Sequence, residues 1–331
     1  MFNSHLELLA QIASLYYEHN LKQEEIANRT GYSRSMVSRL LTEARERGIV
    51  EIHINYPLER CLDLEEALQA ALGLRIVRVL QRGTLGYAEM LRKLGSMAAS
   101  LIEELVDQGS KRIGISWGTA LYETVSAMRR RNYTDTQVYQ IIGSAGTLTP
   151  ETDGPSLARH LAEALGGQYY TIPAPLIVAN PALREALTQE PSIARVFKEA
   201  QTLSLALVGI GSMEPASSSW VRAGYFDADQ ARRLSLAGVA GDVCGILFDR
   251  AGHLRESELQ SRVVGISPAA LQAIPLKMGI SAGEMKTIPI LGACRAGLVN
   301  CLVTDETAAL GVLESFREDL AHQPLSNSPE K

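Results

Sequence analysis

The stretch from Leu21 to Gly48 reads LKQEEIANRTGYSRSMVSRLLTEARERG, and its pattern predicts two short helices joined by a tight turn. Leu21, Ile26 and Ala27 give the first helix an apolar stripe. Gly31 ends that stripe with a residue that adopts positive φ at little cost, and Ser33 is a good N-cap for the second helix. Apolar residues recur along the second helix at i, i+3, i+4 and i+7, namely Val37, Leu40, Leu41 and Ala44.

The opposite face of the second helix carries polar side chains that predict contact with DNA. When a recognition helix enters the major groove, arginines and short hydroxyl side chains reach phosphates and base edges. From Arg29 to Arg47 five arginines stand against Glu43 and Glu46, a net charge of +3, although residues 1–56 sum to about −1. An arginine-rich face on an arbitrary helix is more often simply solvated, but the helix, turn and helix order favours DNA. The candidate side chains are Ser33, Arg34, Ser35, Ser38, Arg39, Thr42 and Arg45.

Lys22 stands where a helix of this kind usually begins with Ser or Thr. A lysine side chain cannot accept the N–H groups left open at a helix start, and losing such a cap costs about 1 kcal/mol. Glu24 and Glu25 partly offset this loss because the helix dipole favours negative charge in the first turn. Asn20 is an alternative cap. We expect Lys22 and Gln23 to touch the DNA backbone.

The flanking segments complete a predicted winged helix-turn-helix head over residues 1–57. Residues 4–19 form a leading helix with apolar residues at helical spacing, and the alternation from Ile49 to Ile54 predicts a strand that closes the head near Pro57. Residues 58–73 predict a connecting helix that couples the head to a larger domain spanning residues 58–320. Residues 321–331 are predicted to be disordered.

Length and composition exclude several classes of protein. The 331 residues, 46% of them hydrophobic, suffice for a small domain and one large α/β domain. The net charge of −5 argues against broad polyanion coating, and no apolar run approaches the ~18 residues of a membrane helix. The start of the chain lacks a secretion signal, so we expect a cytoplasmic protein. Four cysteines without a C-x-x-C and scattered histidines predict free thiols, no metal and no cofactor.

From Arg75 onward, β-rich runs alternate with helical ones. This alternation predicts an α/β domain with a mainly parallel sheet covered on both faces, where ligands sit at the carboxyl ends of the strands. A long helix is predicted from about Tyr87 to Val106. The predicted strands are Ile76–Leu80, Arg112–Ser116, Gln137–Ile142, Gln168–Ile172, Leu203–Val208, Val243–Phe248, Ala273–Met278 and Leu298–Thr304.

The segment from Ile113 to Leu121 runs from a strand through small residues into a helix. Such a corner exposes backbone N–H groups at a helix start, and Ser116 and Thr119 add hydroxyl donors. This combination suits a phosphate or a carboxylate, although a strand, glycine and helix corner is by itself more often architecture.

Three further strand ends carry charged candidates. The loop from Gly279 to Lys286 brings a lysine toward an anion, although a lone lysine is normally solvated. Asp242 and Asp305 are carboxylates suited to sugar hydroxyls. For Asp305, capping the helix that follows explains the residue equally well.

Eight segments, in order, resemble the SorC-type sugar-binding transcriptional regulators. They span nearly the whole chain and read VSRLLTEARERGIVEIHI, GISWGTAL, QIIGSAG, PAPLIV, LVGIGS, GDVCGILFD, GEMK and LVTDETAA. The resemblance implies an effector domain akin to phosphosugar isomerases and deaminases, with a phosphorylated sugar as the usual inducer. It also implies homo-dimers or homo-tetramers that bind double-stranded operator DNA.

The resemblance further implies roles for individual positions. It places a phosphate-binding loop, a pocket-lining strand end, a hydroxyl-binding carboxylate and a loop that closes over the ligand. The phosphate-binding loop is Ser116, Gly118 and Thr119, and the pocket-lining strand end is Gln140 and Gly143. The hydroxyl-binding carboxylate is Asp242, and the closing loop contains Gly283 and Lys286. Two residues depart from the family pattern, because Ala282 replaces a glycine and Pro289 interrupts an expected alanine-rich helix.

Two alternatives to a regulator of sugar phosphates stay open. One is a regulator that responds to an unphosphorylated sugar or polyol. The other is an isomerase-like or deaminase-like enzyme, which needs a general base beside the phosphate loop. Asp242 and Asp305 are the available carboxylates, but no signature of those enzymes accompanies them. We therefore predict a ligand-responsive regulator without catalytic residues.

Overall fold

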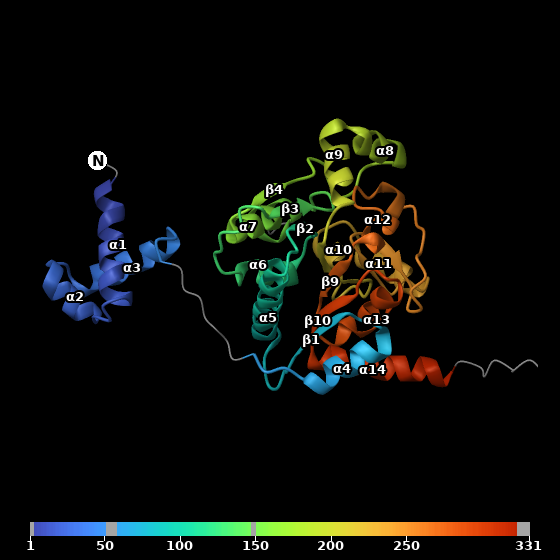
Figure 1. Cartoon of the computed structure of the whole chain (residues 1–331), viewed down its shortest axis with the longest axis horizontal. Coiled ribbons are helices and arrows are strands. Elements are labelled where there is room, and N and C mark those ends of the chain that lie inside the picture. The colour runs from blue at the N-terminus through green and yellow to red at the C-terminus, as the bar shows by residue number, and fades with distance from the viewer. Residues whose placement is uncertain (1–2, 51–57, 147–149, 323–331) are drawn as a thin grey trace, which may run out of the picture. The chain divides into compact units, whose positions relative to one another are not determined.

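The computed structural model describes residues 3–50, 58–146 and 150–322 and divides the chain into two compact units, residues 1–55 and 56–331 (Figure 1). We describe each unit by itself and call them the head and the body. The described part of the head holds three helices, α1 (Asn3–Tyr17), α2 (Gln23–Thr30) and α3 (Arg34–Glu46). The predicted leading helix therefore ends two residues earlier than expected.

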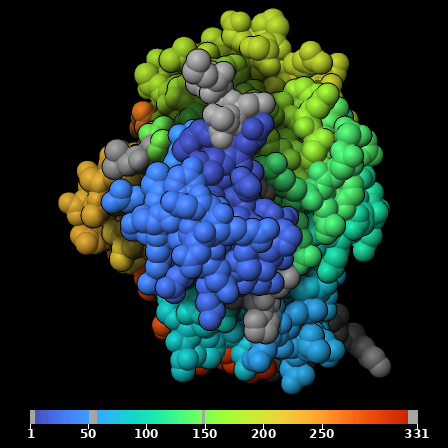
Figure 2. Space-filling model, turned by 90° about the vertical axis from the view of Figure 1, so that its left-hand side faces the viewer, coloured from blue at the N-terminus to red at the C-terminus, as the bar shows by residue number. Residues whose placement is uncertain are grey.

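The apolar faces of α1, α2 and α3 form the core of the head, whose surface is drawn in blue in Figure 2. After α2, Gly31 adopts a φ of 77°, which makes the tight turn. Ser33 then caps α3, because its hydroxyl accepts a hydrogen bond from the N–H of Met36 at 3.2 Å. The predicted helix, turn and helix are thus present. The buried side chains of this core include Leu9, Ile12, Ile26, Val37, Leu40, Leu41 and Ala44.

Lys22 is the N-cap residue of α2, and its side chain makes no capping hydrogen bond. The carboxylate of Glu25 instead accepts the backbone N–H of Lys22 at 2.7 Å. The suggestion that Asn20 caps this helix is wrong, because α2 begins at Gln23 and Asn20 lies before the cap with a φ of 54°. Glu25 therefore makes the half of a capping box that binds the N-cap N–H, while the Lys22 side chain makes none of the other half.

Two predictions fall mainly on residues outside the described ranges. Ile49 and Val50 pack against the head core, but the rest of the predicted wing strand, from residue 51 on, is outside the description. The same holds for the predicted disordered tail from residue 323, whereas Ala321 still belongs to the last helix.

A seven-stranded parallel sheet forms the centre of the body, in the order β1-β10-β9-β5-β2-β3-β4. This confirms the predicted parallel α/β fold. From β2 the chain moves outward through β3 and β4, then returns to β5 on the other side of β2. Strand order therefore reverses between β2 and β5. The strands are β1 (Ile76–Leu80), β2 (Arg112–Ile115), β3 (Gln137–Gln140), β4 (Gln168–Tyr170), β5 (Leu205–Gly209), β9 (Leu276–Ile280) and β10 (Cys301–Asp305).

Alternate residues of these strands enter two separate hydrophobic cores, as expected for a sheet covered on both faces. In β5, Leu205 and Leu207 pack with α5, α6 and α7, whereas Ala206 and Val208 pack on the other face, where α4, α13 and α14 lie (Figure 1). The strand predicted at Ala273–Met278 begins only at Leu276, because α12 continues to Ala273.

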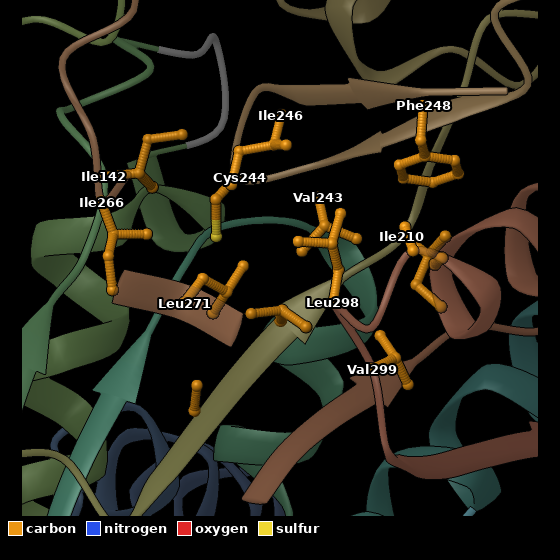
Figure 3. Packing of buried hydrophobic residues seen from close by; sticks show 14 of the residues in the cluster. Ile142, Ile210, Val243, Cys244, Ile246, Phe248, Ile266, Leu271, Leu298 and Val299 are labelled. Atoms are coloured by element: carbon orange, nitrogen blue, oxygen red, sulfur yellow. The ribbon is translucent and has the colours of Figure 1, made fainter. Parts of the chain in front are cut away.

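The prediction of a single strand from Val243 to Phe248 is wrong. The segment is a hairpin of β7 (Gly241–Val243) and β8 (Ile246–Phe248), which forms a small antiparallel sheet with β6 (Gly211–Ser212). The chain turns at Cys244 and Gly245, which both adopt positive φ. Figure 3 shows Val243 and Phe248 pointing from this hairpin into the core. A continuous apolar run concealed the turn.

The connecting helix is present as α4 (Leu62–Leu72) and ends at Gly73 as predicted, but it begins four residues later than expected, because Arg60 pairs with Leu80 of β1 instead. No helix among the described residues is long and apolar enough to cross a membrane. The other helices are α5 (Tyr87–Asp107), α6 (Thr119–Ser126), α7 (Gly154–Leu165), α8 (Pro181–Gln189), α9 (Pro191–Ala200), α10 (Ser219–Arg222), α11 (Ala228–Leu236), α12 (Pro268–Ala273), α13 (Thr287–Arg295) and α14 (Glu306–Ala321), with short 3-10 turns at Pro150–Thr152, Gln260–Arg262 and Glu284–Lys286.

We predict that Ser33→Ala destabilises α3, because the N–H of Met36 loses its acceptor. The expected loss is about 1 kcal/mol, which corresponds to roughly fivefold faster amide exchange in α3. Hydrogen exchange of the full chain measures this effect. Ser38→Ala, an exposed position within the same helix, serves as control and leaves exchange unchanged or slower. Equal exchange in wild type and Ser33→Ala contradicts the assigned cap.

Candidate anion-binding site

A cavity of about 290 Å³ lies at the carboxyl ends of β2, β5 and β9. This is the point where strand order reverses, at which open α/β sheets bind ligands. Its volume is at the lower end of the ~300–1,000 Å³ of small-molecule sites. The cavity brings together residues that are far apart in the chain, namely Ser116, Gly118, Thr119, Asp242, Gly283 and Lys286 from the sequence prediction and Trp117, Trp220, Arg222 and Ser281 in addition.

The corner between β2 and α6 supplies backbone donors to the cavity. Gly118 occupies the N-cap position of α6 with a φ of 127°, and its N–H donates to the carbonyl of Thr152 at 3.0 Å. Ser116 is buried, and its hydroxyl accepts the N–H of Gly209 at 3.3 Å, which ties the corner to β5. The N–H groups of the first turn of α6 have no acceptor within the helix, so they suit an anion.

Lys286 provides a positive charge in the cavity wall. Its ammonium donates to the carbonyl of Ile210 at 2.8 Å, which uses one of three N–H donors. Burial lowers the pKa of Lys286 to about 8, Asp242 opposes this shift and Arg222 adds to it. The cost of holding this ammonium charged falls when an anion enters the cavity.

Ser281 lies beside Lys286 in the cavity wall, on the loop Ser281–Lys286, which we call the lysine loop. Its side chain is 97% buried, since only 3% of the residue surface is exposed, and its hydroxyl has no hydrogen-bond partner among the described residues. A buried hydroxyl without a partner costs about 1–3 kcal/mol. This hydroxyl is therefore free to bond with a polar ligand in the cavity.

Asp242 lines the cavity, but its two carboxylate oxygens are already engaged. One accepts the indole N–H of Trp220 at 2.8 Å, and the other accepts the N–H of Gly245 at 3.1 Å. Burial raises the pKa of Asp242, and these two hydrogen bonds and Lys286 oppose that rise. In this structure Asp242 positions Trp220 and the β7–β8 hairpin. Its predicted role in binding a hydroxyl stays a prediction.

Sequence reasoning missed the two tryptophans of the cavity. Trp117 and Trp220 are arranged edge to face, with ring centroids 6.1 Å apart. Trp117 stands inside the motif that predicted the phosphate loop, so its position was available as a signal. Trp220 lies in a segment between β6 and β7 that carries no motif, and only the fold brings it to the site.

Gln140 and Gly143 do not line this cavity. The amide of Gln140 donates to the carbonyl of Ile142 at 2.6 Å and accepts the N–H of Ile172 at 2.8 Å, which satisfies both of its ends. Gly143 packs so closely that a Cβ there would meet the carbonyl of Pro175 at 2.5 Å. The structure therefore corrects the prediction: both residues hold the end of β3 against neighbouring segments.

Asp305 is fully buried at the end of β10 and also does not line the cavity. Its carboxylate accepts the N–H of Gly283 at 2.7 Å, so it holds the lysine loop instead of facing the ligand. Its side chain makes no capping hydrogen bond to α14, which corrects the alternative explanation. Gly283 adopts a φ of 95°, a conformation that favours glycine, whereas Ala282 does not have positive φ. Pro289 fits in the first turn of α13.

The candidate DNA face of the head is exposed. Glu43, beside this face, pairs with Arg47 at 2.7 Å and with His5 at 3.0 Å, so the charge of Arg47 is partly neutralised. Contact of this face with DNA stays a prediction. The exposed candidates are Lys22, Ser33, Arg34, Ser35, Ser38, Arg39, Thr42 and Arg45, and Gln23 is half-buried.

No group of three potential ligands among the described residues could hold a metal ion. All four cysteines are free: Cys61 is half-buried, and Cys244, Cys294 and Cys301 are buried. Burial raises the pKa of Cys294 and of Cys301 to about 12, so both thiols stay protonated at neutral pH.

Comparisons with known proteins place this fold and cavity in a class. A family model described as "Putative sugar-binding domain" matches residues 56–314. The sorbitol operon regulator of Klebsiella pneumoniae is 33% identical over 315 residues, which cover 92% of this chain and 97% of that protein. The transcriptional regulator LsrR of Enterobacter sp. (strain 638) is 30% identical and covers 93% of each chain. The crystal structure of the full-length sorbitol operon regulator SorC from Klebsiella pneumoniae has a TM-score of 0.70 at 31% identity, covering 93% of this chain and 99% of that one.

The body thus matches a sugar-binding domain, and the chain as a whole is similar to a transcriptional regulator. The chain belongs to the family of SorC-type sugar-binding transcriptional regulators. These relatives are regulators and not enzymes, so the isomerase or deaminase alternative no longer stands.

We predict that sulfate, whose charge is constant above pH 6, binds the cavity more weakly as pH rises through about 8. The folded-state pKa of Lys286 is lowered, so its ammonium is largely charged at pH 7 and largely neutral at pH 9; affinity falls about tenfold. Calorimetric titration measures the affinity.

Lys286→Met is expected to bind sulfate weakly at both pH values. Lys198→Met, which removes an exposed lysine on α9, is the matched control and keeps the wild-type pH profile. A wild-type affinity that is the same at pH 7 and pH 9 contradicts the role of Lys286.

Proposed function

We propose that this protein binds operator DNA through the polar face of α3 and that a phosphorylated sugar in the body cavity controls that binding. The relatives' names supply the context: they include regulators of a sorbitol operon and of deoxyribonucleosides. The observation that carries the effector proposal is Lys286. Its half-buried ammonium lines the cavity and takes part in none of the ion pairs among the described residues.

A phosphate fits this environment better than a neutral group does. A buried charge is costly unless it is paired, and a phosphoryl group can pair with the ammonium of Lys286 while accepting N–H groups of α6. Arg222, exposed at the cavity, adds a second cation. The orphaned hydroxyl of Ser281 supplies one more donor.

The alternative effector is an unphosphorylated sugar or polyol. Such a ligand needs carboxylates or amides that accept its hydroxyls. Asp242 already accepts hydrogen bonds from Trp220 and Gly245 on its two oxygens, which leaves less acceptor capacity for hydroxyls. The edge-to-face tryptophans suit an apolar sugar face in either case.

The DNA part of the proposal requires more than one head. A helix-turn-helix protein reads two half-sites about 34–36 Å apart or a multiple of that distance. We therefore propose a homo-dimer or homo-tetramer in which the effector changes how the paired heads match the operator spacing. The focused charge of α3, not the net charge of −5, provides the attraction to phosphates.

We predict that Arg39→Ala weakens operator binding by about 1–3 kcal/mol, because an exposed arginine on α3 is lost from the contact surface. Fluorescence anisotropy with duplex DNA from upstream of the protein's own gene, at several salt concentrations, measures affinity and salt dependence. Arg233→Ala removes an exposed arginine on α11 and is the control. An unchanged affinity for Arg39→Ala shows that the DNA face has been chosen wrongly.

We predict that a sugar monophosphate raises the thermal midpoint of the body by about 5 °C at roughly 100 times its Kd, since it binds only the folded state. The panel contains the monophosphates of glucose, fructose, sorbitol and deoxyribose, each beside its parent compound. Lys286→Met is expected to abolish the shift. Equal shifts from a phosphate and its parent support the unphosphorylated alternative, and no shift from any compound rejects a sugar effector of this panel.

A further inference from the structure

The chain that leaves the head enters the body along strand β1. The N–H of Cys61 donates to the carbonyl of Val79 at 3.0 Å, and the N–H of Gln81 donates to the carbonyl of Glu59 at 2.8 Å. Between them, Arg60 pairs with Leu80 in an antiparallel bridge. We call Glu59–Cys61 the entry segment. It is therefore an additional backbone partner on the free edge of β1.

Side chains fix the entry segment as well. The guanidinium of Arg60 binds the carboxylate of Glu65 on α4 through two N–H groups, one of them at 2.8 Å. The same carboxylate accepts the N–H of Val79 at 2.9 Å. Because Glu65 is buried, these bonds hold the entry segment, α4 and β1 together as one unit.

Arg82 lies two residues after the end of β1 and connects this unit to the effector cavity. Its guanidinium donates to the hydroxyl of Thr307 at 2.8 Å and lies 3.5 Å from the carboxylate of Asp305. Its backbone N–H donates to Glu306 at 3.2 Å. Thr307 donates to Asp305 in turn. Arg82 thus binds three consecutive residues at the start of α14.

Asp305 completes the connection, because its other oxygen accepts the N–H of Gly283 in the lysine loop at 2.7 Å. Asp305 is fully buried, and Leu80 is its neighbour across the β1–β10 pairing. The lysine loop and the entry segment are consequently joined through one buried carboxylate and one arginine. Neither of these two residues lines the cavity.

We propose that Asp305 and Arg82 are positioning residues that couple the pose of the lysine loop to the entry segment, and so transmit the state of the cavity toward the head. This inference rests on the proposed function, in which the lysine loop contacts the effector. When a ligand draws Lys286 toward it, Gly283 moves with the loop and its hydrogen bond to Asp305 changes. Arg82 then carries the change to the end of β1, where the entry segment is bound.

A test that needs neither DNA nor a sugar separates this proposal from the proposed function. Gly283→Ala perturbs the loop, because a φ of 95° is strained for any residue with a Cβ, while no atom lies within 3.4 Å of the new methyl group. Hydrogen exchange with mass spectrometry follows peptides that contain the amides of Cys61 and Gln81. We expect exchange about threefold faster than in wild type.

The second variant asks whether the effect travels through Arg82. In an Arg82→Ala background, Gly283→Ala is expected to add almost nothing to exchange at Cys61 and Gln81. Arg78→Ala is the matched control. Arg78 lies on β1, close in sequence to Arg82, which follows the end of that strand. Its side chain is 25% exposed against 26% for Arg82, and it pairs with Glu104 on α5 instead. In that background the effect of Gly283→Ala persists in full.

Gly297→Ala controls for backbone strain in general, because Gly297 also has positive φ and open space around it but lies outside the lysine loop. It is expected to leave the entry segment unchanged. The coupling proposal is overturned if Gly283→Ala leaves exchange at Cys61 and Gln81 at the wild-type rate. It is equally overturned if the effect has the same size with and without Arg82.

Coupling between the lysine loop and the entry segment is reciprocal, so the reverse experiment tests the proposal if Gly283→Ala does not fold. Arg60→Ala loosens the entry segment at a half-exposed position. We expect faster exchange in the peptide that contains Gly283, and loss of this effect when Arg82→Ala is also present. Circular dichroism verifies that each variant is folded. No change at Gly283 overturns the proposal.

Discussion

The reversal of strand order between β2 and β5 determines where the cavity of the body lies, and we propose that a small molecule binds there. Because all seven strands of the sheet are parallel, their carboxyl ends meet at one edge, and the connections leave that edge in opposite directions on the two sides of the reversal. Ser116 after β2, Gly209 at the end of β5 and Ser281 after β9 meet there for this reason. The position of the cavity therefore follows from the strand order and not from any single side chain.

We propose that charge then determines which ligands the cavity binds. The cavity wall penalises the charged form of Lys286, and the lowered pKa of about 8 reflects that cost, although the group stays largely charged at pH 7. The neighbouring carboxylate, Asp242, is committed to Trp220 and Gly245, so it does not pair closely with Lys286. An incoming anion therefore relieves an imbalance that the unliganded fold retains. Asp305 is likewise engaged within the protein: its carboxylate accepts the N–H of Gly283 in the lysine loop, and it does not line the cavity.

Sequence patterns predicted the elements well and the directions of side chains less well. Apolar periodicity located the helices of the head and most strands, since each buries one stripe or two faces. It failed at Val243–Phe248, where Cys244 and Gly245 make the turn and Cys244 adopts a positive φ that its apolar side chain does not signal. Gln140, Gly143 and Asp305 were placed correctly at strand ends, but which of them reaches the cavity depends on strand order. Trp220 could not be found, because only tertiary packing brings it to Asp242.

We propose that an anionic sugar bound in the body changes the affinity of the head for DNA. The most direct measurement is the operator affinity of the full-length protein, determined with and without a saturating sugar monophosphate at constant salt. The account predicts a change of about tenfold, equivalent to about 1.4 kcal/mol of coupling free energy, and loss of this change in Lys286→Met. Identical operator affinities in both conditions, for a sugar phosphate that binds the cavity, would contradict it.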